Sequence, residues 1–330
     1  MAPSPPTWTR GAASGWPRSS ARRRCGSSTP SREPGPESST GADWGRAMEP
    51  DEIRERSRAA WDQAAAGWSA RREMFTAAGA PVSRKLVEMA KLEPGDDVLE
   101  VACGLADTGL LAAEAVAPGG RVLVSDASES MVAAASERVE AEAPEGAHVE
   151  ARRLEAEWLD LSAAMLDAVI SRWGYMLLPD PEAGLREARR VLKPGGRVAL
   201  AVWGPRDRNP WIALVQEQLE RLGHAGPVDD TAPGMFALSA PGALEEVLEA
   251  AGFTEPRVEE LEVHWTSAGL DERWQEMVET SVSLPAALEG LSPAEHYELR
   301  EAVDEALAPY VAADGTVSVP GLSLVAGAEA

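Results

Sequence analysis

Cysteine is scarce in this chain, and so are histidine and long apolar runs. Cys25 and Cys103 are far apart, which argues against a disulfide framework or a cysteine metal site and fits a reducing cytoplasm. The four histidines lack the spacing of metal ligands. No apolar run approaches the ~20 residues of a transmembrane helix. We therefore expect a soluble cytoplasmic protein with no metal and no membrane partner.

Basic residues are also few for a chain of this size. The 31 lysines and arginines face 54 acidic residues, so the formal net charge is −23 at pH 7. Nucleic-acid binding depends on clustered basic side chains that release counterions, so this balance argues against a nucleic-acid partner. We interpret the acidity as a solubility surface. The hydrophobic content of 44% is ample for a substantial core.

Residues 1–47 lack apolar periodicity and are rich in Ser, Pro, Gly and Arg. No apolar signal-peptide core follows Arg22, Arg23 and Arg24, and we expect this segment to be disordered. A helix-like sequence begins directly after Met48. This pattern is consistent with two alternatives. Translation begins at Met48, or residues 1–47 are a genuine disordered tail.

The remainder, 48–330, predicts a single domain. Apolar positions recur at helical spacing from Asp51 to Phe75, and Pro81 is expected to open a second helix. Short apolar runs then alternate with helical segments as far as Trp203. This alternation predicts a doubly wound, Rossmann-like α/β fold whose mostly parallel seven-stranded sheet carries helices on both faces. The expected strands are 97–102, 121–126, 148–153, 167–173, 197–203, 256–265 and 316–325.

After Trp203 the alternation breaks down. Amphipathic helices are expected at 211–222, 271–284 and 293–307. They alternate irregularly with one further helix and with the last two strands. Such insertions either form a cap over a substrate or simply cover the edge of the sheet.

The strongest chemical signal is the segment from Val98 to Gly109, in which an apolar strand leads through small residues into a helix. Glu100 would be costly to bury unpaired, so we expect an N–H or cationic partner, the alternative being a solvated carboxylate. Asp126 closes the next strand about twenty residues beyond Gly104. An acidic side chain there can accept both hydroxyls of a ribose, although an isolated strand-end Asp is more often a helix cap.

These segments resemble the first motifs of class I S-adenosylmethionine-dependent methyltransferases, broadly the small-molecule enzymes of the ubiquinone and menaquinone biosynthesis type. In that family an acidic residue ends the first strand, and a glycine-rich loop lets the backbone approach the methionine part of the cofactor. Glu100 and Gly104 match this pattern. Ala102 and Ala106 stand where the family has glycine, so we expect the loop to avoid left-handed geometry at both.

The resemblance implies further contacts with S-adenosylmethionine. Met131 would pack on the adenine ring, although a core position is the commoner outcome. In the Glu155-Ala-Glu segment, the first carboxylate would accept from the adenine amino group and the next N–H would reach the ring. Trp173 would line the sulfonium pocket by cation–π attraction, with ordinary packing as the alternative. The expected cofactor-binding residues are Glu100, Ala102, Gly104, Asp126, Ala127, Met131, Glu155, Ala156, Arg172 and Trp173.

The resemblance also divides the domain into three parts. Residues 48–93 would form an N-terminal helical lid, since Trp61 and Trp68 project from nearly the same helical face. Residues 94–203 would form the cofactor-binding core. Residues 204–330 would complete the sheet and carry the helical insertions of a substrate cap.

The implied activity is methyl transfer from S-adenosylmethionine to a small-molecule acceptor. One alternative is an NAD-dependent oxidoreductase, because 104–109 also fits a dinucleotide fingerprint with its middle glycine replaced by alanine. Another is a noncatalytic S-adenosylmethionine-binding or regulatory protein. No catalytic residue is assigned, because nothing in the sequence places a base beside an acceptor. The side chains considered as bases are His224, His264, His296 and Tyr175.

Overall fold

The computed structural model describes Trp16 and residues 49–330. Seven strands form one sheet in the order β3-β2-β1-β4-β5-β7-β6. The strands are β1 (Asp97–Val101), β2 (Arg121–Asp126), β3 (His148–Arg153), β4 (Leu166–Arg172), β5 (Leu192–Trp203), β6 (Thr254–Ser267) and β7 (Val317–Glu329). The first five are parallel, and β7 runs antiparallel to both β5 and β6. The expected doubly wound α/β fold is confirmed.

Ten α-helices surround this sheet within the described part of the chain. They are α1 (Pro50–Ala70), α2 (Arg72–Ala90), α3 (Asp107–Val116), α4 (Glu129–Glu142), α5 (Pro181–Val191), α6 (Pro210–Arg221), α7 (Ala243–Ala250), α8 (Leu270–Thr280), α9 (Leu284–Glu289) and α10 (Pro293–Leu307). Local chemistry sets several of their starts. Ser128 accepts from the Met131 N–H to cap α4, and Asp180 accepts from the Ala183 N–H to cap α5.

The boundary between the first two helices differs from the sequence-based prediction. The expectation that Pro81 opens a helix is wrong, because Pro81 lies inside the continuous helix α2. A proline at an interior position normally costs about 3 kcal/mol. Phe75, Val82 and Leu86 are nevertheless buried in the main core, so packing against the sheet continues through the proline.

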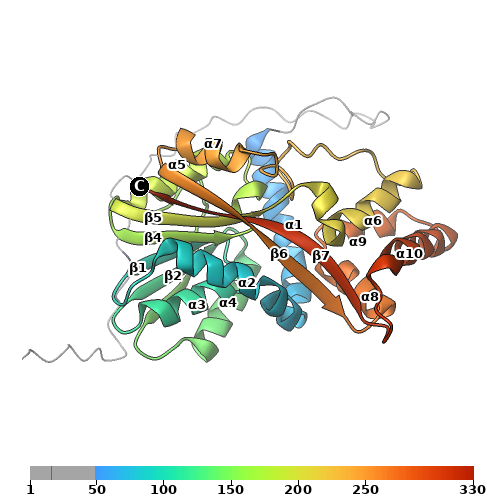
Figure 1. Ribbon diagram of the computed structural model, residues 1–330, viewed down its shortest axis with the longest axis horizontal. Helices are drawn as coiled ribbons and strands as arrows, with labels where there is room; N and C mark the ends of the chain where they lie inside the picture. The colour runs from blue at the N-terminus through green and yellow to red at the C-terminus, as the bar shows by residue number, and fades with distance from the viewer. Residues whose placement is uncertain (1–15, 17–48) are drawn as a thin grey trace, which may run out of the picture.

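The molecule has two lobes joined by the long β6–β7 ribbon (Figure 1). One lobe is the sheet with its flanking helices. The other, which we call the cap, consists of α6, α8, α9 and α10 beside the far ends of β6 and β7. The cap has a core of its own, in which Leu299 and Val303 pack with Val317 and Val319. Helix α1 runs between the lobes.

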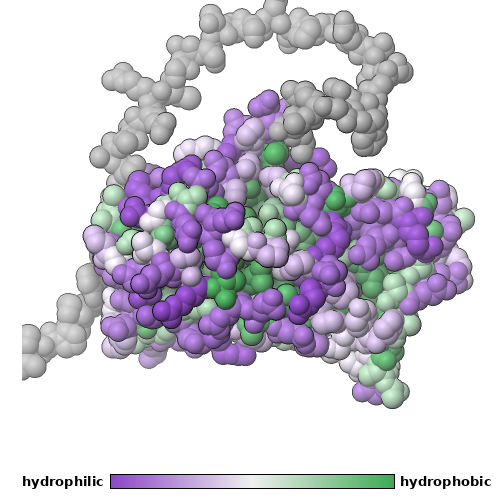
Figure 2. Space-filling view, turned by 45° about the horizontal axis from the view of Figure 1, so that its top comes forward, coloured by the Kyte–Doolittle hydropathy of each residue, from purple (hydrophilic) through white to green (hydrophobic). Residues whose placement is uncertain are grey.

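The described surface is largely hydrophilic, as expected from the composition. Figure 2 shows one face, on which hydrophilic residues predominate and hydrophobic residues gather toward the middle and again at the lower right. Within Trp16 and residues 49–330, no helix is long and apolar enough to cross a bilayer. The same residues include no group of three or more His, Cys, Asp or Glu arranged to hold a metal ion.

Trp16 is the one described residue of the first 48, so the expected disorder of 1–47 otherwise falls outside the described residues. Its indole is only 3% exposed, and the Arg121 guanidinium lies 4.5 Å from the ring centroid. A buried ring is not expected in a segment whose sequence has no apolar periodicity.

Candidate functional site

The loop between β1 and α3 turns sharply at alternate residues. Ala102, Gly104 and Ala106 have φ angles of 53°, 51° and 60°. The expectation that both alanines avoid left-handed geometry is therefore wrong. Only a few residues separate the strand from the helix, and the reversal needs left-handed backbone at positions where glycine is normally used. Alanine has the smallest side chain that retains Cβ, and each such alanine costs about 1–2 kcal/mol.

This strain predicts an unusual outcome for Ala106→Gly. Although Ala106 is fully buried, the relief of strain should offset the lost methyl burial and the extra entropy of glycine. We expect the free energy of unfolding to stay within about 0.5 kcal/mol of wild type. Ala113→Gly, at an equally buried site inside α3, should cost about 1.5 kcal/mol. Urea unfolding measures the free energy of unfolding of both variants. Equal losses of stability in the two would contradict the proposed backbone strain at Ala106.

Glu100 is buried at the carboxyl end of β1 with 1% of its surface exposed. Its Oε2 accepts a hydrogen bond of 2.8 Å from the Gly109 N–H in the first turn of α3. The alternative of a solvated carboxylate is therefore wrong, and the expected N–H partner is a backbone one. Burial raises the pKa of Glu100 from 4.5 to about 8. A Cβ at Gly109 would overlap this carboxylate and Val124, so only glycine fits there.

Asp126 ends β2 beside this loop and remains partly exposed. Its Oδ2 accepts from the Gly104 N–H at 3.0 Å, and its Oδ1 accepts from the Ser128 N–H at 3.0 Å. Burial raises the pKa of Asp126, and these N–H groups act in the opposite direction. The carboxylate thus joins the loop after β1 to the turn after β2, where Ala127 lies. The structure brings together the residues expected to meet the cofactor's ribose and methionine portions.

The loop after β3 carries a second acidic group. Glu155 Oε1 accepts from Arg58 at 2.8 Å. Glu157 is only 5% exposed and accepts from Arg54 at 2.6 and 2.8 Å. Both arginines come from α1, one helical turn apart, and neither was singled out from the sequence. Ala156, between the two glutamates, is buried in the main core.

Helix α1 also covers the loop after β1. The Trp68 ring lies 3.8 Å from the position a Cβ on Gly104 would occupy. Asp62 Oδ1 accepts from the Ser128 hydroxyl at 2.6 Å and from the Ser130 N–H at 3.0 Å. Met131, at 1% exposure, packs with α1 in a small cluster. The cofactor edge of the sheet is therefore closed by this helix.

The far end of α1 is attached to the cap. Trp68 Nε1 donates to the Thr280 carbonyl at 3.0 Å, and Arg71 Nε donates to Glu279 at 2.6 Å. Gly67 packs so tightly on the Glu279 carbonyl that a Cβ would overlap it. One helix thus contacts the loops after β1, β2 and β3 and the last turn of α8.

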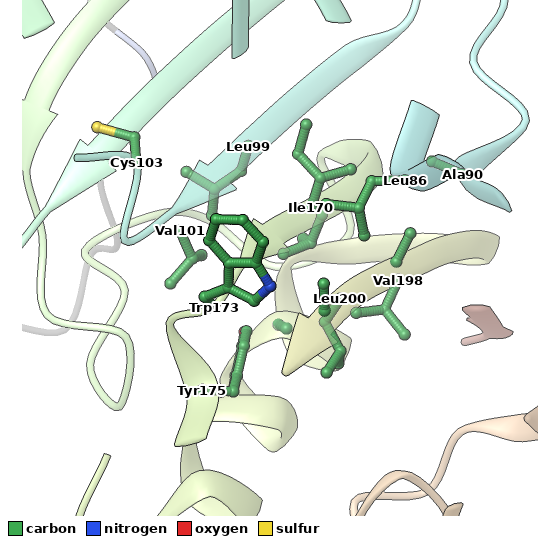
Figure 3. Close-up of a cluster of buried hydrophobic side chains, with 14 of the residues drawn as sticks. Leu86, Ala90, Leu99, Val101, Cys103, Ile170, Trp173, Tyr175, Val198 and Leu200 are labelled. Carbon is green, nitrogen blue, oxygen red and sulfur yellow. The ribbon is translucent and has the colours of Figure 1, made fainter. Parts of the chain in front are cut away.

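Arg172 and Trp173 follow the expected topology, and the Arg172 guanidinium lies 5.0 Å from the centroid of the Trp173 ring. Arg172 Nη2 pairs with Asp107 at 2.7 Å, and Nη1 donates to Ser83 at 2.9 Å. Trp173 has a left-handed φ of 62°, and its indole donates to Ser323 Oγ at 3.0 Å. Figure 3 shows the Trp173 indole among the apolar side chains of the sheet core. Their contact with the cofactor remains a prediction.

Comparison with known proteins agrees with this geometry. Residues 98–196 match a methyltransferase domain family. The nocamycin O-methyltransferase of Saccharothrix syringae is 34% identical over 206 residues, covering 57% of this chain and 70% of that protein. The demethylmenaquinone methyltransferase of Thermus thermophilus is 30% identical over 182 residues, covering 52% and 80%. The chain belongs to the class I S-adenosylmethionine-dependent methyltransferases.

Solved structures agree on the fold of this methyltransferase. A putative methyltransferase from Bacillus halodurans has a TM-score of 0.50 at 19% identity, covering 75% of this chain and 97% of that one. A phosphoethanolamine N-methyltransferase 2 from Haemonchus contortus has a TM-score of 0.52 at 18% identity, covering 84% and 60%. The predicted enzyme class and cofactor are confirmed, and the comparisons support neither the oxidoreductase nor the noncatalytic alternative.

The sequence analysis did not identify three residues that join α1 to the loops after β2 and β3. Arg54, Arg58 and Asp62 lie on α1 and contact the loops after β2 and β3. Their spacing of four residues places them on one helical face. This spacing is the sequence feature that could have identified them. An exposed charge at such a spacing is ordinarily solvated, so the pattern alone does not identify a partner.

Proposed function

We propose that this methyltransferase transfers the methyl group of S-adenosylmethionine to a small organic acceptor, with α1 as a lid over the cofactor. The observation that carries the proposal is the set of contacts from α1 to all three cofactor-edge loops and to the cap. The names of the two relatives support a small-molecule acceptor, since nocamycin and demethylmenaquinone are both small molecules.

The cofactor would lie at the carboxyl ends of β1, β2 and β3. The partly exposed Asp126 carboxylate suits a ribose, because oxygens that already accept one N–H each have lone pairs left for hydroxyl groups. Gly104 has no Cβ, so its backbone would let the methionine portion approach closely once the Trp68 ring moves aside. Met131 and Ala127 suit the adenine side. Glu155 would reach the adenine amino group while it shares its carboxylate with Arg58.

The chemistry of the step is a displacement at the methyl carbon. When bound, S-adenosylmethionine would supply that carbon to the acceptor's nucleophilic atom, with S-adenosylhomocysteine as the leaving group and the acceptor's proton passing to water. The chain's contribution is alignment and exclusion of water, both of which a closed α1 provides. Partly buried Trp68 and buried Met131 line the closed side with apolar surface.

The lid contacts predict a kinetic effect. The double variant Arg54→Gln/Arg58→Gln removes both ion pairs to the loop after β3, so α1 should open more readily. We expect S-adenosylhomocysteine to dissociate about tenfold faster, the equivalent of about 1.4 kcal/mol. Stopped-flow tryptophan fluorescence would measure the rate. Arg84→Gln, at an exposed position on α2, is the matched control and should leave the rate unchanged.

Two results would contradict these proposals separately. Calorimetry that finds no binding of S-adenosylmethionine to the folded protein would contradict the cofactor site. Equal dissociation rates in the double variant and the wild type would contradict only the lid.

A further inference from the structure

Three buried hydrogen-bond donors in the region between the two lobes have no acceptor. They are the indole N–H groups of Trp211 and Trp265 and the Nε–H of Arg273. Trp265 is 1% exposed and Arg273 is 3% exposed. All three groups can only donate, and each buried donor without an acceptor costs about 1–3 kcal/mol. Such a set calls for a group that supplies oxygen lone pairs.

The three donors belong to one cluster built from α6, β6 and α8. The Trp211 and Trp265 rings are stacked with centroids 4.1 Å apart and planes 23° from parallel. Arg273 Nη2 donates to the Trp211 carbonyl at 3.2 Å. The donors therefore come from neighbouring side chains, although they lie far apart in sequence.

Arg273 is incompletely neutralised within this cluster. Its nearest carboxylate oxygen, Oε2 of Glu276, is 3.7 Å from Nη1, which is too far for a hydrogen bond. That same oxygen accepts from the Ser267 hydroxyl at 2.5 Å. Burial lowers the pKa of Arg273 to about 10. A buried guanidinium with one long ion pair and a free Nε–H retains capacity for a second anion.

The cluster lies next to the cofactor edge of the sheet. Trp203, at the end of β5, contacts the Trp211 ring at 4.7 Å and stacks on Trp173 at 4.1 Å. On the lid side, Phe75 meets the Trp265 ring edge-on at 5.5 Å and stacks on Trp68 at 3.8 Å. The rings thus form a continuous series from the loop at Gly104 to the cap.

We infer that a planar, conjugated acceptor with an acidic oxygen binds against Trp265 on the face that Trp211 now covers, and that Arg273 and the Trp265 N–H donate to that oxygen. The inference rests on the proposed function, whose acceptor it describes. Trp211 is the partly exposed member of the stack and is carried by α6 of the cap, so its displacement opens this face. A flat ligand then replaces one ring contact with another, while its carboxylate, phenolate or enolate accepts from the donors.

Titration calorimetry at saturating S-adenosylhomocysteine tests this inference with two matched probes. These are 1-hydroxy-2-naphthoic acid and 1-hydroxy-2-naphthamide, which share a ring system and differ in the anionic oxygen. The wild type should bind the acid at least about tenfold more tightly than the amide. In Arg273→Gln/Glu276→Gln, which removes the charge without leaving a lone buried carboxylate, that preference should disappear.

Two further variants complete the experiment. Trp265→Phe keeps a ring but removes the N–H, and it should weaken binding of the acid about fivefold. Arg300→Gln/Asp304→Asn removes an arginine–carboxylate pair from α10 of the same cap and should leave both affinities unchanged. Melting curves identify any variant that does not fold, and Trp265→Phe still decides the matter if the double variant fails.

The outcomes separate the two proposals. If S-adenosylhomocysteine itself does not bind, the proposed function fails. If it binds, but the acid binds no more tightly than the amide, or keeps its preference after the arginine is removed, only the acceptor inference is overturned.

Discussion

Replacing Asp126 with Ala is expected to weaken binding of S-adenosylmethionine by about 2–4 kcal/mol, or roughly 30-fold to 1000-fold in Kd. The variant would lose two hydrogen bonds that the ribose hydroxyls donate to the carboxylate. It would also lose the carboxylate that joins the Gly104 and Ser128 N–H groups, so the loop after β1 would be less well ordered before binding. Titration calorimetry on the purified variant measures the change.

Asp126→Asn is the graded control for this experiment. It keeps one acceptor oxygen but places an amide donor near a backbone N–H, so its affinity should fall between those of wild type and Asp126→Ala. Both variants should retain a cooperative melting transition, because Asp126 is a partly exposed strand-end residue. Unchanged affinity for S-adenosylmethionine in a folded Asp126→Ala protein would contradict the assignment of Asp126 to the ribose.

The largest expected effect on stability comes from Glu100. Its pKa is about 8 in the folded protein against a usual 4.5, so the folded state keeps a proton that the unfolded chain releases between these values. The stabilising contribution is therefore complete below pH 4.5 and is lost as the pH rises to 8. The slope is on the order of 1.4 kcal/mol per pH unit. Glu100→Gln stays neutral and should be more stable than wild type by a few kcal/mol at pH 8.

Urea unfolding at several pH values between 5 and 9 measures this difference. The free energy of unfolding of the wild type should fall more steeply with pH than that of Glu100→Gln. Glu114→Gln, at an exposed position on α3, should keep the slope of the wild type. Parallel curves for wild type and Glu100→Gln would mean that Glu100 is ionised in the folded protein throughout this range.

The sheet could be predicted from sequence because each buried parallel strand is a short apolar run with a turn signal at its end. The buried strand Arg121–Asp126 lies at the predicted residues, and the predicted helix at Pro293–Leu307 matches α10. The break between α1 and α2 could not be predicted in the same way. A proline argues for a helix start, and only the sheet beneath α2 shows why the helix continues through it.

The part of the site that lies at the carboxyl ends of adjacent parallel strands could be predicted from the sequence. Asp126 and Gly104 meet because adjacent parallel strands end at the same edge of the sheet. The backbone angles of Ala102 and Ala106 depend on the distance that the loop has to span, which residue types do not reveal. The pairing of Arg54 with Glu157 joins segments 103 residues apart and depends on where α1 lies.

The position of β7 affects how the protein assembles during synthesis. β7 lies between β5 and β6 and pairs with both, yet it follows β6 and every cap helix in the chain. The cofactor half, from β1 to β5, can form its parallel pairings while the chain is still emerging from the ribosome. β6 has no neighbour in the sheet until β7 arrives, so the sheet is completed only at this last step. A chain that stops before Val317 would therefore retain β1 and β2, which carry Glu100 and Asp126, and the loop after β3 that carries Glu155, but leave β6 without a place in the sheet.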